Sequence, residues 1–486
     1  MLWGLFYQKG GGNINECLEL FLNSSDSLLP AELVERTRGF DEIEEKLMWC
    51  SFGGNDYYGY KKIINEEEDI ARFVAQRSVK KHPYDPRIES FIALYESEEN
   101  ISLDEEQKNA VRMFCTEHFG ILTGGPGTGK TSVLKCALYV LNKLFEENPK
   151  DILLCAPTGK AARRMAEATG MRANTLLGAL EYNPATLKAG RVINADILFI
   201  DEASMTDDMQ MTLLVRNCPL KTRVFLIGDN EQLPPVGRGA VLRDLLTFKV
   251  VPKTRLVKTF RQKEGSTLLS NIQIVRDGYK KRFVDGSDFV TFEGLDGMMP
   301  LYYSEVKKRG LENVMILSPT RKEGRYCSEN LNRNIQKILN SNDGVRGQMT
   351  RDGRNLIIPF RIGDPVMQLV NRKGVANGEI GTVIDINPVS VQFGNTVISY
   401  RGRDLFQLDL AYAISIHKSQ GSEYEAVFVI CSNEGNLDRN MIYTAITRAK
   451  KQCYVFGNNN LIKKACEKQT SMERVTWLSR FDTLVL

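Results

Sequence analysis

Short apolar runs alternate with segments of helical spacing along most of this chain. Six runs are bounded by turn or polar residues: Ile121-Leu122, Ile152–Ala156, Ile197–Ile200, Val224–Ile227, Val314–Leu317 and Ala426–Cys431. Most of them show no alternation of apolar and polar positions, which is typical of strands buried on both faces of a parallel sheet. Apolar residues between them recur at helical spacing, for example from Val133 to Leu141. Strands that alternate with helices predict an α/β fold.

The order of these runs predicts the domain organisation. The runs fall into two groups that separate near residues 240–260, so we expect two α/β domains, at residues 101–250 and 251–486. Residues 1–100 are charged and helical in character, which predicts a short, mainly helical N-terminal region. Residues 360–410 contain short β-type stretches separated by Gly, Asn and Pro, which predict a small β-barrel-like insert in the second domain.

Composition excludes several classes of protein but identifies none. The chain has 486 residues, which allows about two to four domains. It carries 64 Lys and Arg against 60 Asp and Glu, a net charge of +4. That balance does not decide for or against nucleic-acid binding, because binding requires only a local basic track. Hydrophobic residues at 42% and charged residues at 26% argue against disorder.

Cysteine, histidine and apolar content limit the compartment. The ten cysteines contain no C-x-x-C pair, and three histidines are too few for a zinc cluster by spacing. Thiols in apolar runs, such as Cys155, are typical of buried cysteines in a reducing compartment. No apolar run approaches the roughly 18 residues that span a bilayer. We therefore expect a cytoplasmic protein, or one of the host cytoplasm if the source is viral, without a membrane partner.

A phosphate-binding motif follows the first apolar run and precedes a helical segment. Its glycines allow backbone N–H groups to surround phosphates at a helix N-terminus. Lys130 is expected to reach the β- and γ-phosphates, and the Thr131 hydroxyl to bind Mg²⁺. A chance glycine-rich turn is the alternative, which the full match in this context disfavours. The eight residues are Gly124, Gly125, Pro126, Gly127, Thr128, Gly129, Lys130 and Thr131.

Other candidate catalytic residues follow later strands. Asp201 and Glu202 end an apolar run, where Asp201 is expected to hold Mg²⁺ and Glu202 to polarise the attacking water. Adjacent carboxylates favour a hydrolase over a small-molecule kinase. Gln232 is placed to contact the γ-phosphate, although a proline-stiffened loop is the alternative. Arg261 and Arg448 are candidate arginine fingers from the second half of the chain.

These residues form an ordered set that resembles the superfamily 1 helicases, and within them the RecD-like branch related to the alpha subunit of exodeoxyribonuclease V. The resemblance covers about residues 101–460, and all helicase blocks occur in family order. The blocks are Gln107, the phosphate loop, Ala156–Ala162, Asp201–Ser204, Gly228–Val236, Phe260–Gln262, Ser318–Arg321, Asn377–Gly381, His417–Glu423 and Tyr443–Ala449.

The resemblance implies two tandem RecA-like P-loop NTPase domains with ATP and Mg²⁺ bound between them. It places a strand-separating β-hairpin insert at residues 176–195 of the first domain and an SH3-like insert at 360–410 of the second. Gln107 would recognise the adenine. Gln232, Arg261 and Arg448 would contact the γ-phosphate, and Gln420 and Glu423 would couple nucleotide to DNA.

A DNA track is expected at the ends of corresponding strands in the two domains. Pro157-Thr158 and Pro319-Thr320 supply hydroxyls and backbone N–H groups for consecutive phosphates, and His417 and Lys418 are further DNA-binding candidates. Two departures limit the resemblance. Leu177 stands where the family has a histidine, so no contact is transferred to that position. Ser415 replaces a threonine and retains its hydroxyl.

The leading interpretation is an ATP-dependent 5′-to-3′ DNA helicase that acts in repair, recombination or replication. Its expected partners are single-stranded DNA, tailed or forked duplexes, and single-strand-binding or recombination proteins, and we expect a monomer. One alternative is a translocase or recombination-complex subunit that does not unwind alone, if the segment Leu180–Ile193 is too small for a wedge. The other is a nucleotide-controlled binding switch, against which the paired strand-end motifs and two arginine candidates argue.

Overall fold

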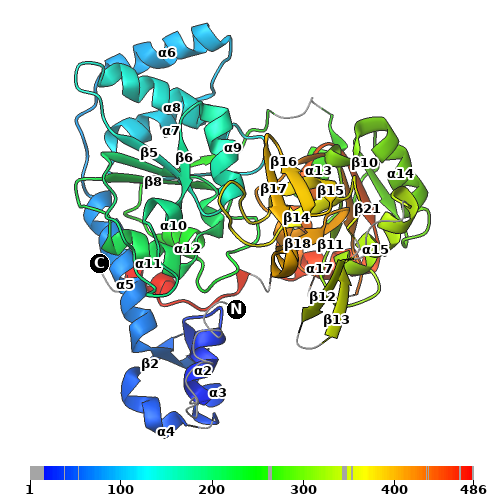
Figure 1. The fold of residues 1–486 in the computed structure, drawn as a ribbon. Coiled ribbons are helices and arrows are strands. Elements are labelled where there is room, and N and C mark those ends of the chain that lie inside the picture. The colour runs from blue at the N-terminus through cyan, green and yellow to red at the C-terminus, as the bar shows by residue number, and fades with distance from the viewer. Residues whose placement is uncertain are drawn as a thin grey trace.

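Two α/β units lie side by side, each around its own β-sheet, with a smaller N-terminal module beneath the first unit (Figure 1). The computed structural model describes residues 16–37, 39–52, 54–260, 265–341, 347–351, 354–358, 360–433, 435, 437–469 and 472–483. The two α/β units, each built around its own large sheet, confirm the predicted α/β class. Among the helices of the described residues, none is long and apolar enough to cross a membrane.

The first unit contains a six-stranded sheet with the order β6-β5-β7-β8-β4-β9, and all its pairings are parallel. Four of its strands contain the predicted apolar runs, which confirms that continuous runs marked buried parallel strands. The strands are β4 (Phe119–Gly124), β5 (Ile152–Ala156), β6 (Ala173–Thr175), β7 (Ile197–Ile200), β8 (Arg223–Gly228) and β9 (Lys253–Leu256).

Helices cover both faces of this sheet. Ile197 and Phe199 of β7 pack with α6, α7 and α8, whereas Leu198 and Ile200 pack with α5, α11 and α12. Because successive side chains of a strand alternate between faces, a run without polar positions requires this double cover. The helices are α5 (Lys61–Ser78), α6 (Arg87–Glu99), α7 (Glu105–Thr116), α8 (Lys130–Leu144), α9 (Gly159–Thr169), α10 (Leu176–Ala179), α11 (Asp208–Arg216) and α12 (Val241–Thr247).

The second unit has a five-stranded parallel sheet with the order β10-β21-β20-β11-β19. Helices α13, α16 and α17 cover one face, and α14, α15 and the β insert cover the other. The strands are β10 (Phe289–Phe292), β11 (Val314–Ser318), β19 (Ala413–Ser415), β20 (Tyr424–Ile430) and β21 (Ala449–Phe456). The helices are α13 (Thr267–Arg276), α14 (Met298–Arg309), α15 (Ser328–Leu339), α16 (Arg439–Ile446) and α17 (Asn459–Glu467).

The predicted β-rich insert is an antiparallel sheet with the order β17-β16-β15-β14-β18. Its likeness to an SH3 fold stays a prediction. A separate hairpin of β12 (Gly347–Arg351) and β13 (Arg354–Ile358) precedes it. The strands of the insert are β14 (Pro365–Gln368), β15 (Ile380–Ile386), β16 (Val389–Phe393), β17 (Thr396–Tyr400) and β18 (Leu408–Leu410).

The N-terminal module contains a small antiparallel sheet, β1-β3-β2, in addition to the helices that the sequence predicted. Cys17, Phe21 and Val34 are fully buried in its core, next to Ile63 from the start of α5. The helix α5 thus joins the module to the first unit. The elements are α2 (Glu16–Asn23), β1 (Leu28–Pro30), α3 (Ala31–Glu35), α4 (Phe40–Ile43), β2 (Leu47–Phe52) and β3 (Asn55–Tyr60).

Two segments differ in detail from the expected organisation. Strand β9 pairs with β4, so the first sheet extends beyond residue 250 and we propose a boundary after Leu256. In the region expected to form a hairpin insert, the pairing is a single antiparallel bridge between Asn183 and Lys188. Leu180 and Ile193 at its ends are buried in the core of the first unit, which ties this loop down at both sides.

The chain ends on the first unit although its last helix belongs to the second. Residues 472–483, which we call the C-terminal strap, lie at the end of the red segment that runs from the second unit to the first in Figure 1. The strap finishes in a 3₁₀ turn, Leu478–Thr483, that packs against α5 and α12. Its Leu478 side chain is fully buried in the core of the first unit.

Candidate active site between the two units

The phosphate-binding loop connects β4 to the N-terminus of α8. Gly129 adopts a φ of 88°, and a Cβ at this position would lie 2.3 Å from Nε2 of Gln107, so the backbone conformation and the close approach both require glycine. The Nζ of Lys130 donates hydrogen bonds to the carbonyls of Gly124 at 2.6 Å and Gly125 at 3.0 Å. The lysine therefore lies over its own loop, where its charge faces the phosphate-binding position.

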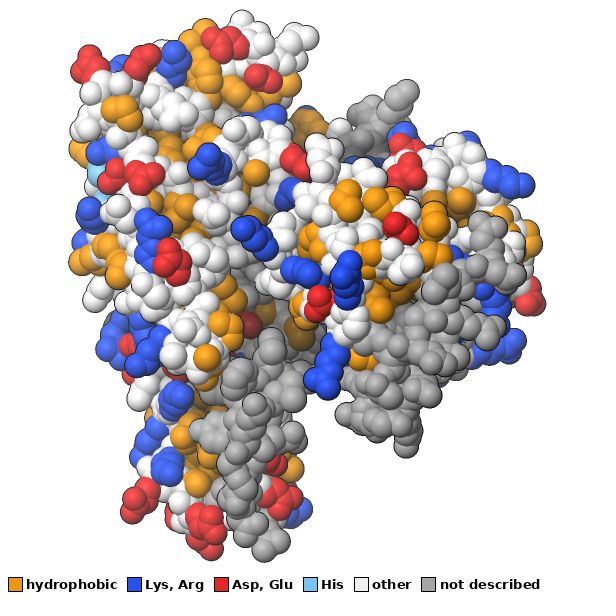
Figure 2. Space-filling view, viewed as in Figure 1, with side chains coloured by type: hydrophobic (Ala, Val, Ile, Leu, Met, Phe, Trp, Pro, Cys, Tyr) orange, Lys and Arg blue, Asp and Glu red, His pale blue; other side chains and the backbone are white. Residues whose placement is uncertain are grey.

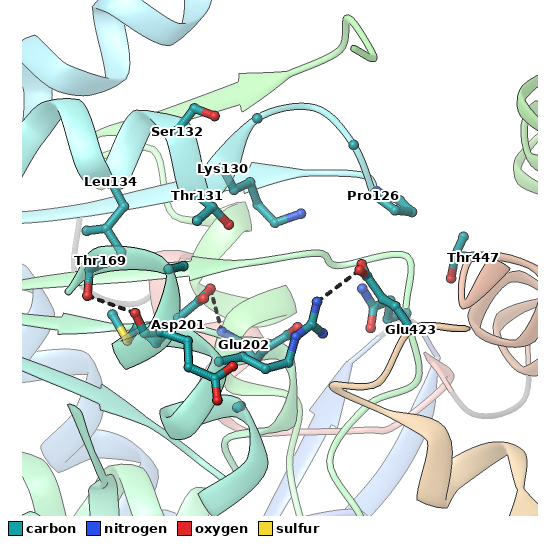
Figure 3. A pocket seen from close by; sticks show the side chains of 18 of the residues that line it. Pro126, Lys130, Thr131, Ser132, Leu134, Thr169, Asp201, Glu202, Glu423 and Thr447 are labelled. Atoms are coloured by element: carbon teal, nitrogen blue, oxygen red, sulfur yellow. Dashed lines mark hydrogen bonds and ion pairs between the residues drawn. The ribbon is translucent and has the colours of Figure 1, made fainter. Parts of the chain in front are cut away.

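A cavity of about 630 Å³ opens beside this loop, and both units line it. Figure 3 shows Lys130 and Thr131 on one side and Glu423 and Thr447 on the other. Asp201 and Glu202 line it as well, so the structure brings the predicted lysine, hydroxyl and carboxylates to one place. The predicted fingers differ in outcome, because Arg448 lines the cavity whereas Arg261 lies outside the described residues.

The two acids occupy a sharp turn after β7. The backbone N–H of Glu202 donates to Oδ1 of Asp201 at 2.8 Å, and Glu202 has a φ of 52°, in the left-handed region. A non-glycine residue in that region is strained, and such strain is concentrated at functional sites. Burial, and next the charge of Glu202, raise the pKa of Asp201 to about 6. A carboxylate that lacks a full counter-charge is suited to receive a cation.

A hydrogen-bond network joins Gln232 of the first unit to Arg448 of the second. Nη2 of Arg448 donates to Oε1 of Gln232 at 2.8 Å, and Nε2 of Gln232 donates to Asp229 at 3.3 Å. The guanidinium also donates to the carbonyls of Thr444 at 3.0 Å and Ser422 at 3.2 Å. Arg448 is only 3% exposed, and burial lowers its pKa. The two γ-phosphate candidates thus contact each other directly.

Gln232 belongs to a loop that is fastened to the second unit at several points. The backbone N–H of Leu233 donates to the Thr444 hydroxyl at 3.0 Å. Nε2 of Gln420 donates to the Leu233 carbonyl at 3.1 Å, and the Asn440 amide donates to the carbonyl of Glu231 at 2.8 Å. We call residues 231–239 the coupling segment. The predicted coupling residue Gln420 therefore contacts this segment, and Glu423 lines the cavity.

The side-chain amide of Gln107 is engaged within the first unit. Its Oε1 accepts from the Asp104 backbone at 3.0 Å, which completes a capping box at the start of α7. Its Nε2 donates to the carbonyl of Thr128 at 3.1 Å. The residue thus contacts the phosphate-binding loop. Its expected role in adenine recognition stays a prediction.

Three basic residues of α9 reach across to the second unit. Arg164 contacts Glu423 at 2.9 Å, and Arg163 contacts Glu379 at 2.8 Å. Lys160 donates to the Ser422 hydroxyl at 2.5 Å. Burial, and next the charge of Arg164, lower the pKa of Lys160 to about 8. At Gly159 a Cβ would lie 2.1 Å from the Cβ of Ala376, so the units approach too closely there for any side chain.

The DNA-binding candidates lie around the same junction. The Thr158 hydroxyl accepts the backbone N–H of Ala161 at 3.3 Å, and the Thr320 hydroxyl donates to the Glu323 carbonyl at 2.6 Å. Lys418 donates to Asn377 at 3.0 Å, in the loop that touches Gly159. Pro157 and Pro319 are buried, and His417 is exposed. Figure 2 shows Lys and Arg side chains on both units near their boundary, although the net charge is small.

Comparison with known proteins shows which helicases this chain is similar to. Residues 102–291 match the AAA domain family, and residues 410–456 match the UvrD-like helicase C-terminal domain family. The chain is 32% identical to the ATP-dependent RecD2 DNA helicase of Deinococcus radiodurans over 387 residues, which are 78% of this chain and 52% of that protein. It is 29% identical to the RecBCD enzyme subunit RecD of Mycolicibacterium smegmatis, over 75% of this chain and 73% of that one. The chain is thus similar to RecD-like helicases over about three quarters of its length.

The chain spans about half the length of its Deinococcus relative. Among solved structures, the Pif1 helicase from Candida albicans matches with a TM-score of 0.47 at 20% identity, over 77% of this chain and 98% of that chain.

Several contacts in this site were not predicted. Phe260 lines the cavity, and its backbone N–H donates to the Gly127 carbonyl at 2.7 Å. Arg164 of α9 forms an ion pair with Glu423 of the second unit at 2.9 Å. Helical spacing relates only neighbours on one helix, and no local pattern shows which residues lie across an interface between units. Distance in the sequence hides such contacts.

Proposed function

We propose that this chain is an ATP-dependent DNA helicase that moves 5′ to 3′ on single-stranded DNA. The observation that carries the proposal is the composite cavity, which has Lys130, Asp201 and Glu202 from one unit and Arg448 from the other. A nucleotide held between two units can change their separation when its γ-phosphate is lost. The names of the relatives support DNA as the track, and the first of them names an ATP-dependent DNA helicase.

The residues present fit the hydrolysis of a nucleoside triphosphate. Lys130 would bind the β- and γ-phosphates, and Glu202 would orient the attacking water and accept its proton. Arg448 would face the charge that develops on the transferred phosphoryl group, since its guanidinium is held in place by three buried hydrogen bonds. Gln232 accepts one of these bonds and would therefore change position together with Arg448.

The same residues fit a magnesium ion. The hydroxyl of Thr131 and the carboxylate of Asp201 line the cavity and offer the hard oxygen ligands that Mg²⁺ prefers. Burial, and next the charge of Glu202, raise the pKa of Asp201, and a bound cation would stabilise its ionised form. Held by Thr131 and Asp201, Mg²⁺ would supply positive charge that offsets the charge of the phosphates.

Coupling to DNA follows from the contacts of the two units. Thr158 and Thr320 are placed at the ends of corresponding strands, β5 and β11, and would bind backbone phosphates on the two units. Closure of the cavity around ATP would shorten the distance between them, and its opening would restore it. We further propose tailed or forked duplexes as substrates, a monomeric motor, and single-strand-binding or recombination proteins as its partners.

The rate of ATP hydrolysis with and without single-stranded DNA tests this function. We expect strong stimulation by single-stranded DNA, weaker stimulation by RNA of the same length, and loss of hydrolysis in Lys130→Ala. The variant should remain folded by circular dichroism, because the Lys130 ammonium is part of an open cavity. Hydrolysis that is indifferent to DNA would contradict a DNA motor and favour a nucleotide-controlled switch.

One observation favours a second candidate, a translocase that does not separate strands alone. The loop expected to act as the wedge has a single bridge, between Asn183 and Lys188, in place of a hairpin of two strands. In a helicase, this single bridge would have to hold the loop in shape while it separates the DNA strands. DNA-stimulated ATPase activity without unwinding of any tailed duplex would support this candidate over the helicase.

A further inference from the structure

The coupling segment is fastened at two ends by different parts of the chain. Its first part, residues 231–233, is bound by Gln420, Asn440 and Thr444 of the second unit. Its second part, residues 235–239, is bound by the C-terminal strap. The first set of contacts comes from the second unit itself, whereas the strap has crossed to the first unit before it makes its contacts (Figure 1).

One strap residue, Arg474, makes all of the strap's side-chain hydrogen bonds to the coupling segment that are described. Its Nη1 donates to the carbonyls of Gly237 and Gly239, both at 2.6 Å, and its Nη2 donates to the Pro235 carbonyl at 2.7 Å. A planar guanidinium has five donors in a fixed arrangement, so one side chain can hold three carbonyls in a defined geometry. Arg474 thereby fixes the path of five consecutive residues.

The opposite side of the coupling segment has no room to move. A Cβ at Gly237 would lie 2.1 Å from Asp207, and one at Gly239 would lie 1.8 Å from Asp208. The backbone N–H of Asp208 donates to the Arg238 carbonyl at 3.0 Å. The segment is therefore held between α11 on one side and Arg474 on the other.

The strap itself is anchored by the residues that follow Arg474. The Val475 carbonyl accepts from the backbone of Ser27 at 3.0 Å and of Leu28 at 3.2 Å. The Thr476 hydroxyl donates to Asp244 at 2.7 Å, and the Leu478 backbone donates to Glu67 at 2.9 Å. These contacts tie the strap to the N-terminal module and to the first unit, so Arg474 is attached to a rigid support.

The strap also reaches Gln232. Met472 lines a small cavity together with Gln232, Pro234 and Pro235, and Gln232 in turn accepts a hydrogen bond from Arg448. The path from Arg474 to the Gln232 side chain therefore runs through three residues, Pro235, Pro234 and Leu233. Two of them are prolines, whose rings fix φ and so limit the conformations of this path.

We propose that Arg474 is a positioning residue for ATP hydrolysis: by holding the carbonyls of Pro235, Gly237 and Gly239 it keeps Gln232 in register with Arg448. The inference rests on the proposed function, because it assigns Gln232 and Arg448 to the γ-phosphate. A structural role alone would stabilise the strap without acting on the rate of hydrolysis.

The test compares three variants in the full chain. Arg474→Met removes all three hydrogen bonds and keeps most of the side-chain volume. Arg474→Lys retains a charge and one point of contact, and it serves as the variant of choice if the methionine protein does not fold. Thr476→Val is the matched control, since it breaks a hydrogen bond of the same strap, to Asp244, without touching the coupling segment.

The measurements are kcat and KM for ATP at saturating single-stranded DNA, and the thermal midpoint. We expect Arg474→Met to lower kcat about 5-fold to 50-fold with KM within about twofold, because a misplaced group loses catalysis more than binding. Arg474→Lys should recover part of the loss, and Thr476→Val should lower the midpoint while kcat stays unchanged.

The same substitution in the Gln232→Ala background separates the two roles. If Arg474 acts through Gln232, Arg474→Met should cause no further loss of kcat there, although it lowers the thermal midpoint in both backgrounds. An unchanged kcat in Arg474→Met, or an equal loss with and without Gln232, would overturn the inference and leave the proposed function standing. Absence of ATPase activity in the unaltered chain would instead refute the proposed function, and the inference with it.

Discussion

Replacing Arg448 by methionine separates catalysis from folding, because the structure sets different magnitudes for the two. The buried guanidinium donates to Gln232 at 2.8 Å and to the carbonyls of Thr444 and Ser422 at 3.0 and 3.2 Å. At about 1 kcal/mol net per hydrogen bond, their loss lowers the free energy of unfolding by about 3 kcal/mol. The Thr444 carbonyl keeps a second donor, the Thr447 hydroxyl at 2.9 Å, so we expect about 2 kcal/mol.

The expected loss of catalysis is larger. An arginine that neutralises the transferred phosphoryl group contributes about 10³-fold to 10⁵-fold in kcat, and the lower limit corresponds to about 4 kcal/mol. A protein that loses about 2 kcal/mol of stability generally remains folded. Arg448→Met should therefore be a folded protein whose kcat for ATP falls by about 10³ or more.

The assay is steady-state ATP hydrolysis at saturating single-stranded DNA, with nucleotide affinity measured separately by equilibrium binding of a fluorescent ATP analogue. Lys450→Met is the control, since Lys450 is half exposed and lies 3.8 Å from Glu423, near the same cavity. It should change kcat by less than about threefold, because exposed charge pairs contribute little. A loss of less than about tenfold in Arg448→Met, with binding retained, would refute the assignment of Arg448 to the γ-phosphate.

Three further outcomes test other parts of the site. Glu202→Gln should lower kcat by about 10²-fold to 10⁴-fold while ATP still binds, and wild-type turnover by this variant in a single-turnover assay would exclude Glu202 as the base. Because the pKa of Asp201 is raised to about 6, kcat/KM should rise with pH through that value as the carboxylate ionises; a flat profile from about pH 5 to pH 8 would contradict this. Burial raises the pKa of Asp208 to about 7, so below that pH the folded state holds a proton on Asp208 that the unfolded state has released. The free energy of unfolding should therefore fall as pH rises toward 7. Calorimetry should show that the thermal midpoint falls less with rising pH in Asp208→Asn than in the unaltered chain. Equal slopes in the two proteins would contradict this role of Asp208.

The strands of both large sheets could be predicted because their chemistry is local. A run such as Ile197–Ile200 has no polar position, and only a strand covered on both faces explains that pattern. The sheet of the N-terminal module was missed for the opposite reason. Its β3 contains Asn55, Asp56 and three tyrosines, with much of the strand exposed or half-buried, so periodicity gives little signal.

The site was predictable as residues but not as contacts. The phosphate-binding loop is a contiguous motif whose backbone conformation is encoded in its glycines, so its position followed from the sequence. Gln232 and Arg448 were both assigned to the γ-phosphate, yet they are 216 residues apart and their hydrogen bond could not be inferred. The contacts of Arg474 are even harder to infer from the sequence, because their acceptors are backbone carbonyls, which every residue has.

The most direct test of the proposed 5′-to-3′ helicase activity is the unwinding of labelled duplexes with a single-stranded tail at the 5′ or the 3′ end. We expect ATP-dependent strand separation of the 5′-tailed duplex and no separation of the 3′-tailed duplex. Lys130→Ala should separate neither duplex. Unwinding from the 3′ tail alone, or unwinding that survives in Lys130→Ala, would contradict the proposed activity.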